Sequence, residues 1–248
     1  LIMLRETFSL NYQFEENHWW YVVRRNLIID WIKNHINKKE SDYILDFGCG
    51  TGKLVESLRT AGFKADGADH SDDAIAYCRK RNLLDTIDLK KQKLEEKKYN
   101  LVILADVLEH ADDDVAMLKE VTKPLGDRGK LIVTVPAYNW LWSGEDFVSQ
   151  HVRRYTASDL KQVLKQADLK VFYCTYFNTF LLPAIISTLF FRRIFHPRMM
   201  YESDIRPLPE WQNKILTRIF NLERGFFPAL RFPFGASLGL ICGKNLQA

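Results

Sequence analysis

Apolar and polar residues alternate in blocks from Tyr43 to Val135, and this alternation predicts the fold. Short apolar runs rich in branched residues are typical of buried strands, whereas the stretches between them have apolar residues at helical spacing. In order, the segments read YILDF, KLVESLRTAG, FKADGAD, SDDAIAYCRKRN, TIDLKKQ, NLVILAD, DDDVAMLKEVTK and KLIVTVP. Because strands that alternate with helices form parallel sheets with crossover helices, the pattern predicts an α/β fold.

The flanking segments predict more helices and two more strands. Upstream, the apolar residues of EENHWWYVVRRNLIIDWIKNHI have helical spacing, so this helix should lie over the sheet. Downstream, a helix begins with a capping-box pattern at Thr156 and Asp159, and LKVFYCTYF and GASLGLICGK read as strands. Roughly 55 residues separate these two strands, so we expect a helical insertion there. The predicted division is a helical cap (1–40), a core (41–178), an insertion (179–235) and a final strand (236–248) that completes the sheet.

Length, charge and cysteine content narrow the class of protein. A chain of 248 residues with a net charge of +4 is a mildly basic globular protein, and this charge alone does not imply a nucleic-acid partner. Its four cysteines are far apart, with no CxxC pair or histidine at ligand spacing, so we expect neither a metal site nor a disulfide framework. The first residues lack the pattern of a signal peptide, and a start at Leu1 suggests that the native N-terminus is missing. A cytoplasmic protein is expected.

A glycine-rich turn follows the first strand of the predicted core. Gly48, Gly50 and Gly52 are spaced as G-x-G-x-G at the carboxyl end of that strand, where open α/β sheets bind ligands. The nicotinamide fingerprint needs its third glycine one residue later, and a P-loop needs four residues between its glycines. On their own, the glycines fit an ordinary tight turn equally well. Asp69 ends the second strand, where a carboxylate can accept hydrogen bonds from both hydroxyls of a ribose, and this favours a nucleoside site.

Four motifs in this region resemble those of small-molecule class I S-adenosylmethionine-dependent methyltransferases of types 11 and 12. They are YILDFGCGTGKL, GADHSDDAI, LADVLEH and KLIVTVPA, and the resemblance covers about residues 15–175. It implies S-adenosylmethionine as cofactor, S-adenosylhomocysteine as product, and a seven-stranded, doubly wound, mostly parallel Rossmann-like sheet. The implied strand order is 3-2-1-4-5-7-6, with an antiparallel seventh strand. The candidate cofactor-binding residues are Asp46, Gly48, Cys49, Gly50, Gly52, Asp69, His70, Lys93, Leu94 and Asp106.

The chain departs from this family at the adenine contact. The family often has an aspartate after the third strand, whereas QKLEE here offers Gln92 or Lys93. A bacterial group that resembles this chain combines HWW-x3-RR near the N-terminus with HxRRYT further on. By that analogy, Arg24 or Arg25 reaches the carboxylate of the cofactor.

The residues expected at the methyl group follow the fourth and fifth strands. Methyl transfer is an in-line displacement, so these residues have to align the acceptor and remove its proton. His110 is a candidate general base because imidazole titrates near physiological pH, and Asp106, Glu109 and His151 are further candidates. The alternative is that LEH only packs against or caps the following helix.

Aromatic and basic residues after the fifth strand are candidate substrate contacts. They are Tyr138, Trp140, Trp142, Arg153 and Arg154. The aromatic residues fit either a substrate wall or a hydrophobic lid over the cofactor. The arginines either face an acidic group of the substrate or pair with Asp146 or Asp159 and hold the loop in place.

The expected insertion combines apolar helices with basic residues. No charged residue occurs from Val171 to Phe191, but Asn178 and Pro183 divide this stretch into a strand and a short apolar helix, so we expect no membrane-spanning helix. A second helix, PEWQNKILTRIFNLERG, has an apolar side formed by Trp211, Ile215, Ile219 and Leu222. Basic residues stand at 192, 193, 198, 206, 214, 218, 224 and 231, and acidic ones at 202, 204, 210 and 223. This composition favours an interfacial anchor or a lipid-tail groove, with a substrate-capping subdomain as the alternative.

Taken together, the sequence predicts a methyltransferase that modifies a small or lipid-linked acceptor, with oxygen as the favoured acceptor atom and peripheral membrane contact through residues 180–231. An RNA methyltransferase is the first rival, weakened because ADVLEH replaces the Asn/Asp-Pro-Pro-aromatic motif of amino-group enzymes, and no nucleic-acid partner is expected. A non-catalytic binding or regulatory protein on the same fold is the second rival. The oligomeric state is not predicted.

Overall fold

One mixed sheet organises the molecule. The computed structural model describes the chain except for residues 1–4, 37–42, 228–229 and 246–248. The strands are β1 (Tyr43–Phe47), β2 (Lys64–Asp69), β3 (Ile87–Asp88), β4 (Tyr99–Ala105), β5 (Leu125–Pro136), β6 (Leu169–Phe177) and β7 (Ser237–Lys244). Their order is β3-β2-β1-β4-β5-β7-β6, and β7 runs antiparallel to both of its neighbours. The predicted Rossmann-like fold, with its strand order and antiparallel last strand, is therefore confirmed.

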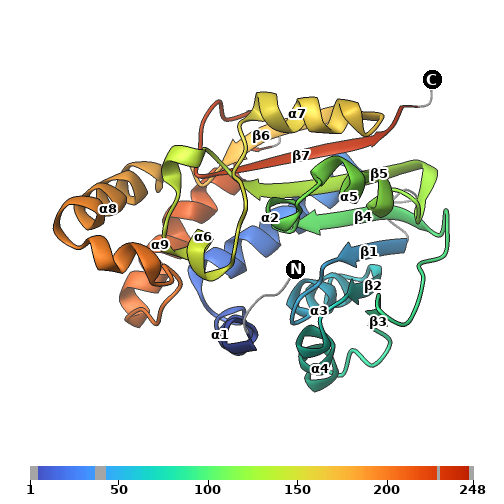
Figure 1. Ribbon diagram of the computed structural model, residues 1–248, viewed down its shortest axis with the longest axis horizontal. Helices are drawn as coiled ribbons and strands as arrows, with labels where there is room; N and C mark the ends of the chain where they lie inside the picture. Colours follow the sequence, from blue (N-terminus) through green and yellow to red (C-terminus); the bar gives the residue numbers. More distant parts are fainter. Residues whose placement is uncertain (1–4, 37–42, 228–229, 246–248) are drawn as a thin grey trace.

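Helices cover both faces of this sheet (Figure 1). One face packs against α2 (Trp19–His35) and α3 (Lys53–Thr60), and the other packs against α5 (Asp114–Val121) and α7 (Ala157–Gln166). The central strand β4 has apolar residues on both sides, because successive side chains of a strand point to opposite faces. Leu101 and Ile103 belong to the core under α2, whereas Val102 and Leu104 belong to the core under α5 and α7. A continuous apolar run thus fits a strand buried on both faces.

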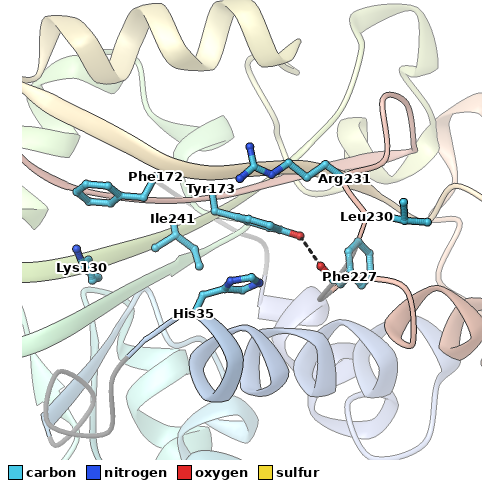
Figure 2. A pocket seen from close by; sticks show the side chains of 8 residues that line it. All are labelled: His35, Lys130, Phe172, Tyr173, Phe227, Leu230, Arg231 and Ile241. Atoms are coloured by element: carbon cyan, nitrogen blue, oxygen red, sulfur yellow. Dashed lines mark hydrogen bonds between the residues drawn. The ribbon is translucent and has the colours of Figure 1, made fainter.

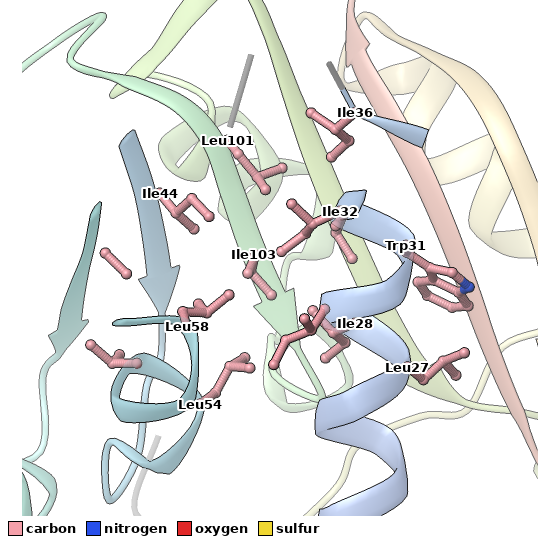
Figure 3. Packing of buried hydrophobic residues seen from close by; sticks show 14 of the residues in the cluster. Leu27, Ile28, Trp31, Ile32, Ile36, Ile44, Leu54, Leu58, Leu101 and Ile103 are labelled. Atoms are coloured by element: carbon pink, nitrogen blue, oxygen red, sulfur yellow. The ribbon is translucent and has the colours of Figure 1, made fainter. Parts of the chain in front are cut away.

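The packing of α2 on the sheet, shown in Figure 3 with Trp31 labelled, depends on one glycine of β7. Trp31 of α2 is fully buried, and its ring lies directly over Gly239 of β7. A Cβ atom at Gly239 would lie 2.0 Å from the Cη2 atom of Trp31, so no larger residue fits beneath the indole. Removal of a buried side chain of this size typically costs about 3–5 kcal/mol of unfolding free energy.

The N-terminal region forms two helices where the sequence indicated one. The predicted helix over residues 15–36 is shorter in the structure, where α2 begins at Trp19 and α1 (Arg5–Phe14) precedes it. The two helices are separated because His18, the N-cap residue of α2, has an extended backbone with φ −69° and ψ 132°. α1 packs against α4 (Asp72–Lys80), which follows β2.

A helical insertion lies between β6 and β7, and this confirms the insertion before the last strand that the predicted fold class includes. It contains α8 (Leu182–Phe195), the short 3₁₀ helix η4 (Pro197–Tyr201) and α9 (Glu210–Arg224), and α8 and α9 lie at the left end of the molecule in Figure 1. Among the described residues, no helix is long and apolar enough to cross a membrane. The boundaries of the four predicted segments of the chain remain predictions.

The buried side of α9 differs from the apolar side that the sequence indicated. α9 packs against α2, with Phe220 in contact with the rings of Trp19 and Trp20. Of the predicted side, only Ile219 packs against the core. The other members, Trp211, Ile215 and Leu222, are exposed.

Candidate active site

The glycine turn leaves open space at the carboxyl end of β1. Gly48, Gly50 and Gly52 all have positive φ values, a backbone conformation that glycine adopts without a steric cost. A Cβ atom added at Gly50 would meet no atom within 4 Å, so this part of the turn faces a cavity. At Gly52 the same atom would lie 2.6 Å from Leu83 and 2.9 Å from Cys78. Gly52, a predicted cofactor contact, thus allows close packing against α4 and the turn after it.

The predicted cofactor residues, apart from Gly52, gather at two adjoining cavities. The larger, of about 670 Å³, is the cofactor cleft, and its predicted members are Gly48, Gly50, Asp69, His70, Lys93, Leu94 and Asp106. The smaller, of about 40 Å³, shares Gly48 and is lined by Arg24, Arg25, Asp46 and Cys49. Gln92 and Lys93 both line the cleft, so the choice between them for the adenine contact stays open.

Asp69 is held at the edge of the cofactor cleft by two backbone donors. The N–H of Gly50 donates to Oδ2 at 3.0 Å, and the N–H of Ser71 donates to Oδ1 at 2.8 Å. Burial raises the pKa of Asp69, and the two backbone hydrogen bonds oppose that rise. The glycine turn and the carboxylate thereby fix each other's position.

A buried charge cluster connects α2 to the ends of β1 and β4. Arg24 pairs with the carboxylate of Asp106, which also accepts a hydrogen bond from the Thr134 hydroxyl at 3.0 Å. Burial alone would lower the pKa of Arg24, but the Asp106 carboxylate raises it above its ordinary value. Burial also raises the pKa of Asp46 to about 7, with further contributions from Glu15 and Asp69. The cluster thus places the Arg24 cation beside the carboxyl groups of Asp106 and Asp46, and burial makes the charge of Asp46 sensitive to its neighbours.

The two candidate arginines of α2 reach the smaller cavity, but each already has a protein partner. The partner of Arg24 is Asp106, and Arg25 donates from Nη1 to the backbone carbonyl of Glu15 at 2.9 Å. A guanidinium group is well suited to bind a carboxylate in such a cavity. Glu15 was not predicted as a site residue. It lies outside every motif, so no sequence pattern marks it as a cavity residue.

His110 and His151 meet beside Glu109 at the end of β4. The two imidazole rings lie 4.7 Å apart, and the backbone N–H of Val152 donates to the carbonyl of Glu109 at 2.9 Å. His110 lines the cofactor cleft, where burial, and then the proximity of His151, lowers its pKa to about 4. It is therefore a neutral imidazole at physiological pH, with a lone pair that can accept a proton.

Glu109 is buried completely and lacks hydrogen-bond partners among the described residues for either carboxylate oxygen. Burial, followed by repulsion from Asp106, raises its pKa well above the ordinary value. One ligand atom from each of Glu109, His110 and His151 lies within 4.8 Å of the others, so these three residues could hold a metal ion. Cysteine spacing, on which the expectation of no metal site depends, carries no information on this cluster, because its members come from two separate segments of the chain.

Asp146 orients the loop that carries His151. It bonds Nδ1 of His151 at 2.8 Å and receives two hydrogen bonds from Arg154, Nε to Oδ1 at 2.8 Å and Nη2 to Oδ2 at 2.6 Å. Burial would raise the pKa of Asp146, but these hydrogen bonds hold it well below its ordinary range. Arg153 instead pairs with Asp114, at 3.0 Å. Both arginines are thus engaged with carboxylates, as the loop-fixing alternative has it, although Arg153 has a partner that the sequence did not suggest.

The aromatic substrate candidates lie apart from both cavities. Tyr138 stacks on Tyr176, with ring centroids 5.2 Å apart, and on Trp140, with centroids 5.6 Å apart. The backbone carbonyls of Trp140 and Trp142 accept hydrogen bonds from Arg193 of α8. This segment therefore connects β5 to the insertion, and its contact with a substrate remains a prediction.

Comparison with known proteins identifies the family. The family described as "Methyltransferase domain" matches residues 21–173, which is more than half of the chain. The chain belongs to this methyltransferase family. The matched segment of the methyltransferase contains the glycine turn, Asp69 and the His110 cluster. Gly50 leaves space where a side chain would otherwise lie, and Asp69 stands at the rim, so the residues present fit the predicted cofactor, S-adenosylmethionine.

Relatives and solved structures agree with this assignment. The methyltransferase is 31% identical over 120 residues to a ubiquinone biosynthesis O-methyltransferase of Rickettsia bellii, covering 45% of this chain and 49% of that protein. It is 28% identical to the protein of that name from Erwinia tasmaniensis, covering 58% and 64% of the two chains. The chain thus spans about half to two thirds of the length of these curated relatives.

Two solved structures share the fold over nearly the whole chain. One belongs to a complex between the Haloferax volcanii Trm112 methyltransferase activator and a putative methyltransferase, with a TM-score of 0.60, 14% identity and coverage of 98% and 96%. The other is a possible histamine N-methyltransferase of Thermotoga maritima, with a TM-score of 0.55, 15% identity and coverage of 96% and 99%. The predictions of family, fold and cofactor are confirmed.

Proposed function

We propose that this methyltransferase transfers a methyl group from S-adenosylmethionine to a hydroxyl oxygen of a small or lipid-linked acceptor. The observation that carries the proposal is the position of a neutral His110 in the same cleft as Asp69 and the open turn at Gly50. Oxygen is favoured as the acceptor atom because the curated relatives from Rickettsia and Erwinia are named O-methyltransferases.

The bound cofactor would supply a methyl group on a positively charged sulfur, which an acceptor oxygen attacks in line. Asp69 and the backbone at Gly50 would hold the nucleoside, and Arg24 or Arg25 would hold the amino-acid carboxylate. A ring nitrogen of His110 would accept the hydroxyl proton as the oxygen–methyl bond forms. Asp146 keeps His151 in place beside it through the 2.8 Å hydrogen bond.

We also propose that residues 180–231 contact a lipid surface, where a lipid-linked acceptor would be found. α8 leaves Phe190 and Phe195 exposed by 65% and 63%, and α9 exposes Trp211 by 62%. Large apolar side chains that are exposed on neighbouring segments of the chain can form an interaction surface. Within the described residues, Arg198 and Arg206 form no ion pair, so their charges are available for anionic headgroups.

Calorimetric titration with S-adenosylhomocysteine, followed by turnover with a panel of phenolic acceptors, tests the enzyme. Binding together with methylated product supports the proposal. Binding without turnover on any acceptor would favour the non-catalytic alternative, and binding of NADH in place of S-adenosylhomocysteine would contradict the cofactor assignment. Dialysis against EDTA before the turnover assay decides whether Glu109, His110 and His151 act with a metal ion, because only a metal-dependent enzyme would lose activity.

A further inference from the structure

A third cavity, of about 450 Å³, lies away from the cofactor cleft (Figure 2). It lies between the last turn of α2, which contributes His35, and the strands β5, β6 and β7. Lys130 of β5 lines it, and this residue pairs with Gly243 near the end of the antiparallel strand β7. The cofactor cleft instead faces the carboxyl ends of β1, β2 and β4. The two cavities share no lining residue.

The charged side chains around this third cavity are all basic. Nζ of Lys130 lies 3.8 Å from the ring centroid of Phe172, and Cζ of Arg231 lies 5.3 Å from the ring centroid of Tyr173. Neither cation forms an ion pair with a carboxylate of the described part of the chain. Nε2 of His35 is buried there without a hydrogen-bond partner among the same residues. Of these groups only Nε2 of His35 is buried, since Lys130 is half-buried and Arg231 is exposed. Buried polar atoms are normally satisfied, so this nitrogen indicates a missing hydrogen-bond partner, and the two cations beside it favour an anionic one.

The floor of the cavity is aromatic and fixed. The hydroxyl of Tyr173 donates to the carbonyl of Phe227 at 3.3 Å, and Figure 2 shows its ring between Arg231 and His35. The ring centroids of His35 and Tyr173 are 4.3 Å apart. Tyr173 and Phe227 are buried, so the floor is formed before any ligand arrives. Apolar walls with a few convergent polar groups are typical of small-molecule sites.

We propose that this third cavity is a second ligand site, which binds a small organic anion with an apolar or aromatic body. The basic side chains of Lys130 and Arg231 attract the anionic group, and the apolar body packs against apolar residues that line the cavity, such as Phe172 and Leu230. A ligand bound here does not reach His110 or Asp69, which line the other cavity, so it is bound without being methylated. The proposal holds whether or not the chain methylates an acceptor oxygen.

Calorimetry with 1-naphthoate as the probe tests this site in the full chain. We expect binding to the unaltered protein, and an affinity at least tenfold weaker for Arg231→Glu and for Lys130→Glu, because each reverses one of the two charges. Arg79→Glu is the matched control, since Arg79 is an exposed arginine of α4 with the same change in net charge. It should bind the probe normally.

Further measurements keep the result specific. Thermal unfolding and S-adenosylhomocysteine titration of each variant should match the unaltered protein, which shows that the fold and the cofactor cleft are intact. The milder Arg231→Gln replaces Arg231→Glu if the charge reversal unfolds the chain. Displacement of the probe by inorganic phosphate would contradict the need for an apolar body. Displacement by S-adenosylhomocysteine, equal binding to all variants, or no binding at millimolar probe would overturn the proposal.

Discussion

In the cofactor cleft, charged side chains are buried and held by hydrogen-bond or ion-pair partners, whereas in the insertion several aromatic side chains of α8 are exposed to solvent. Asp69 accepts two backbone N–H groups, and Asp106 is fixed by Arg24 and Thr134. By contrast, α8 leaves Phe190, Phe191 and Phe195 exposed. The cleft is thus organised before a ligand arrives, whereas the exposed aromatic side of α8 would gain burial only when another surface covers it.

This difference separates two kinds of substitution. A change in the cleft should lower ligand affinity, because the geometry of the free protein is already the binding geometry. A change on the exposed side of α8 should leave the fold and the cleft as they are and alter only the encounter with a partner surface. The predictions that follow test whether the two regions are independent in this sense.

The largest effect is expected for Asp69→Ala. This substitution removes the proposed ribose acceptor and leaves the N–H groups of Gly50 and Ser71 without their partner, so the affinity for S-adenosylhomocysteine should fall about 100-fold or more. Calorimetry measures it. Asp88→Ala is the control, because Asp88 also ends a strand and accepts a backbone N–H, from Lys90 at 3.0 Å, but does not line the cleft. An equal loss in both variants would contradict the role of Asp69.

Removal of three exposed rings of α8 should weaken vesicle binding by roughly 10–30-fold. The variant carries Phe190→Ser, Phe191→Ser and Phe195→Ser, and the loss reflects apolar area that would otherwise be buried in lipid. Flotation with anionic phospholipid vesicles at low salt measures it. Leu84→Ser, at an exposed leucine outside the insertion, should have no effect. A triple variant that floats normally would remove the lipid-surface proposal.

Two glycine substitutions distinguish the cost of backbone strain in the fold from steric exclusion of the ligand. Gly50 and Gly62 have φ values of +56° and +92°, and a Cβ atom at either meets nothing within 4 Å. Alanine at each position should therefore cost about 1 kcal/mol of unfolding free energy, measured by urea denaturation. Only Gly50→Ala should also weaken S-adenosylhomocysteine binding, by about tenfold, because its methyl group occupies the cleft. Similar affinities in both variants would show that the ligand does not approach Gly50.

The smallest effect concerns pH. The pKa of His110 is lowered to about 4, so its ring is neutral and able to accept a proton above that pH and is protonated below it. Turnover should therefore be level near neutrality and fall only as the pH drops through about 4 to 5. His110→Gln should lower kcat more than it raises KM and should lack this acid limb. Circular dichroism at each pH checks that the chain remains folded, and an acid limb that persists in His110→Gln would assign the titration to another group.

Much of the cleft could be predicted because its signals are local in the sequence. The glycine spacing and the aspartate at the end of the second strand are short-range patterns, and they form the Gly50–Asp69 hydrogen bond. The family resemblance supplied the strand order, which hydrophobic patterning alone does not determine. The sequence did not indicate that Glu109 and His151 lie together, because their contact joins segments that are far apart in the chain. The hydrogen bond from the N–H of Val152 to the carbonyl of Glu109 holds these segments together.

The error in α9 has a similar cause. Residues 211, 215, 219 and 222 lie on one side of a helix, but 216, 220 and 223 form a second side with nearly the same spacing. The choice between them is made by α2, whose Trp19 and Trp20 receive the ring of Phe220. Spacing within one helix indicates its possible faces, and only the neighbouring helix determines which face is buried.

The indole of Trp31 over Gly239 has a consequence for the molecule as a whole. The helix α2 contributes Arg24 to the smaller cavity beside the cofactor cleft and His35 to the cavity lined by Tyr173, about 16 Å further along the helix axis. The contact at Gly239 lies between these two ends and admits no additional atom, so it fixes the position of α2 on the sheet and thereby the position of both residues. A residue larger than glycine at position 239 would displace α2 and should therefore disturb both cavities.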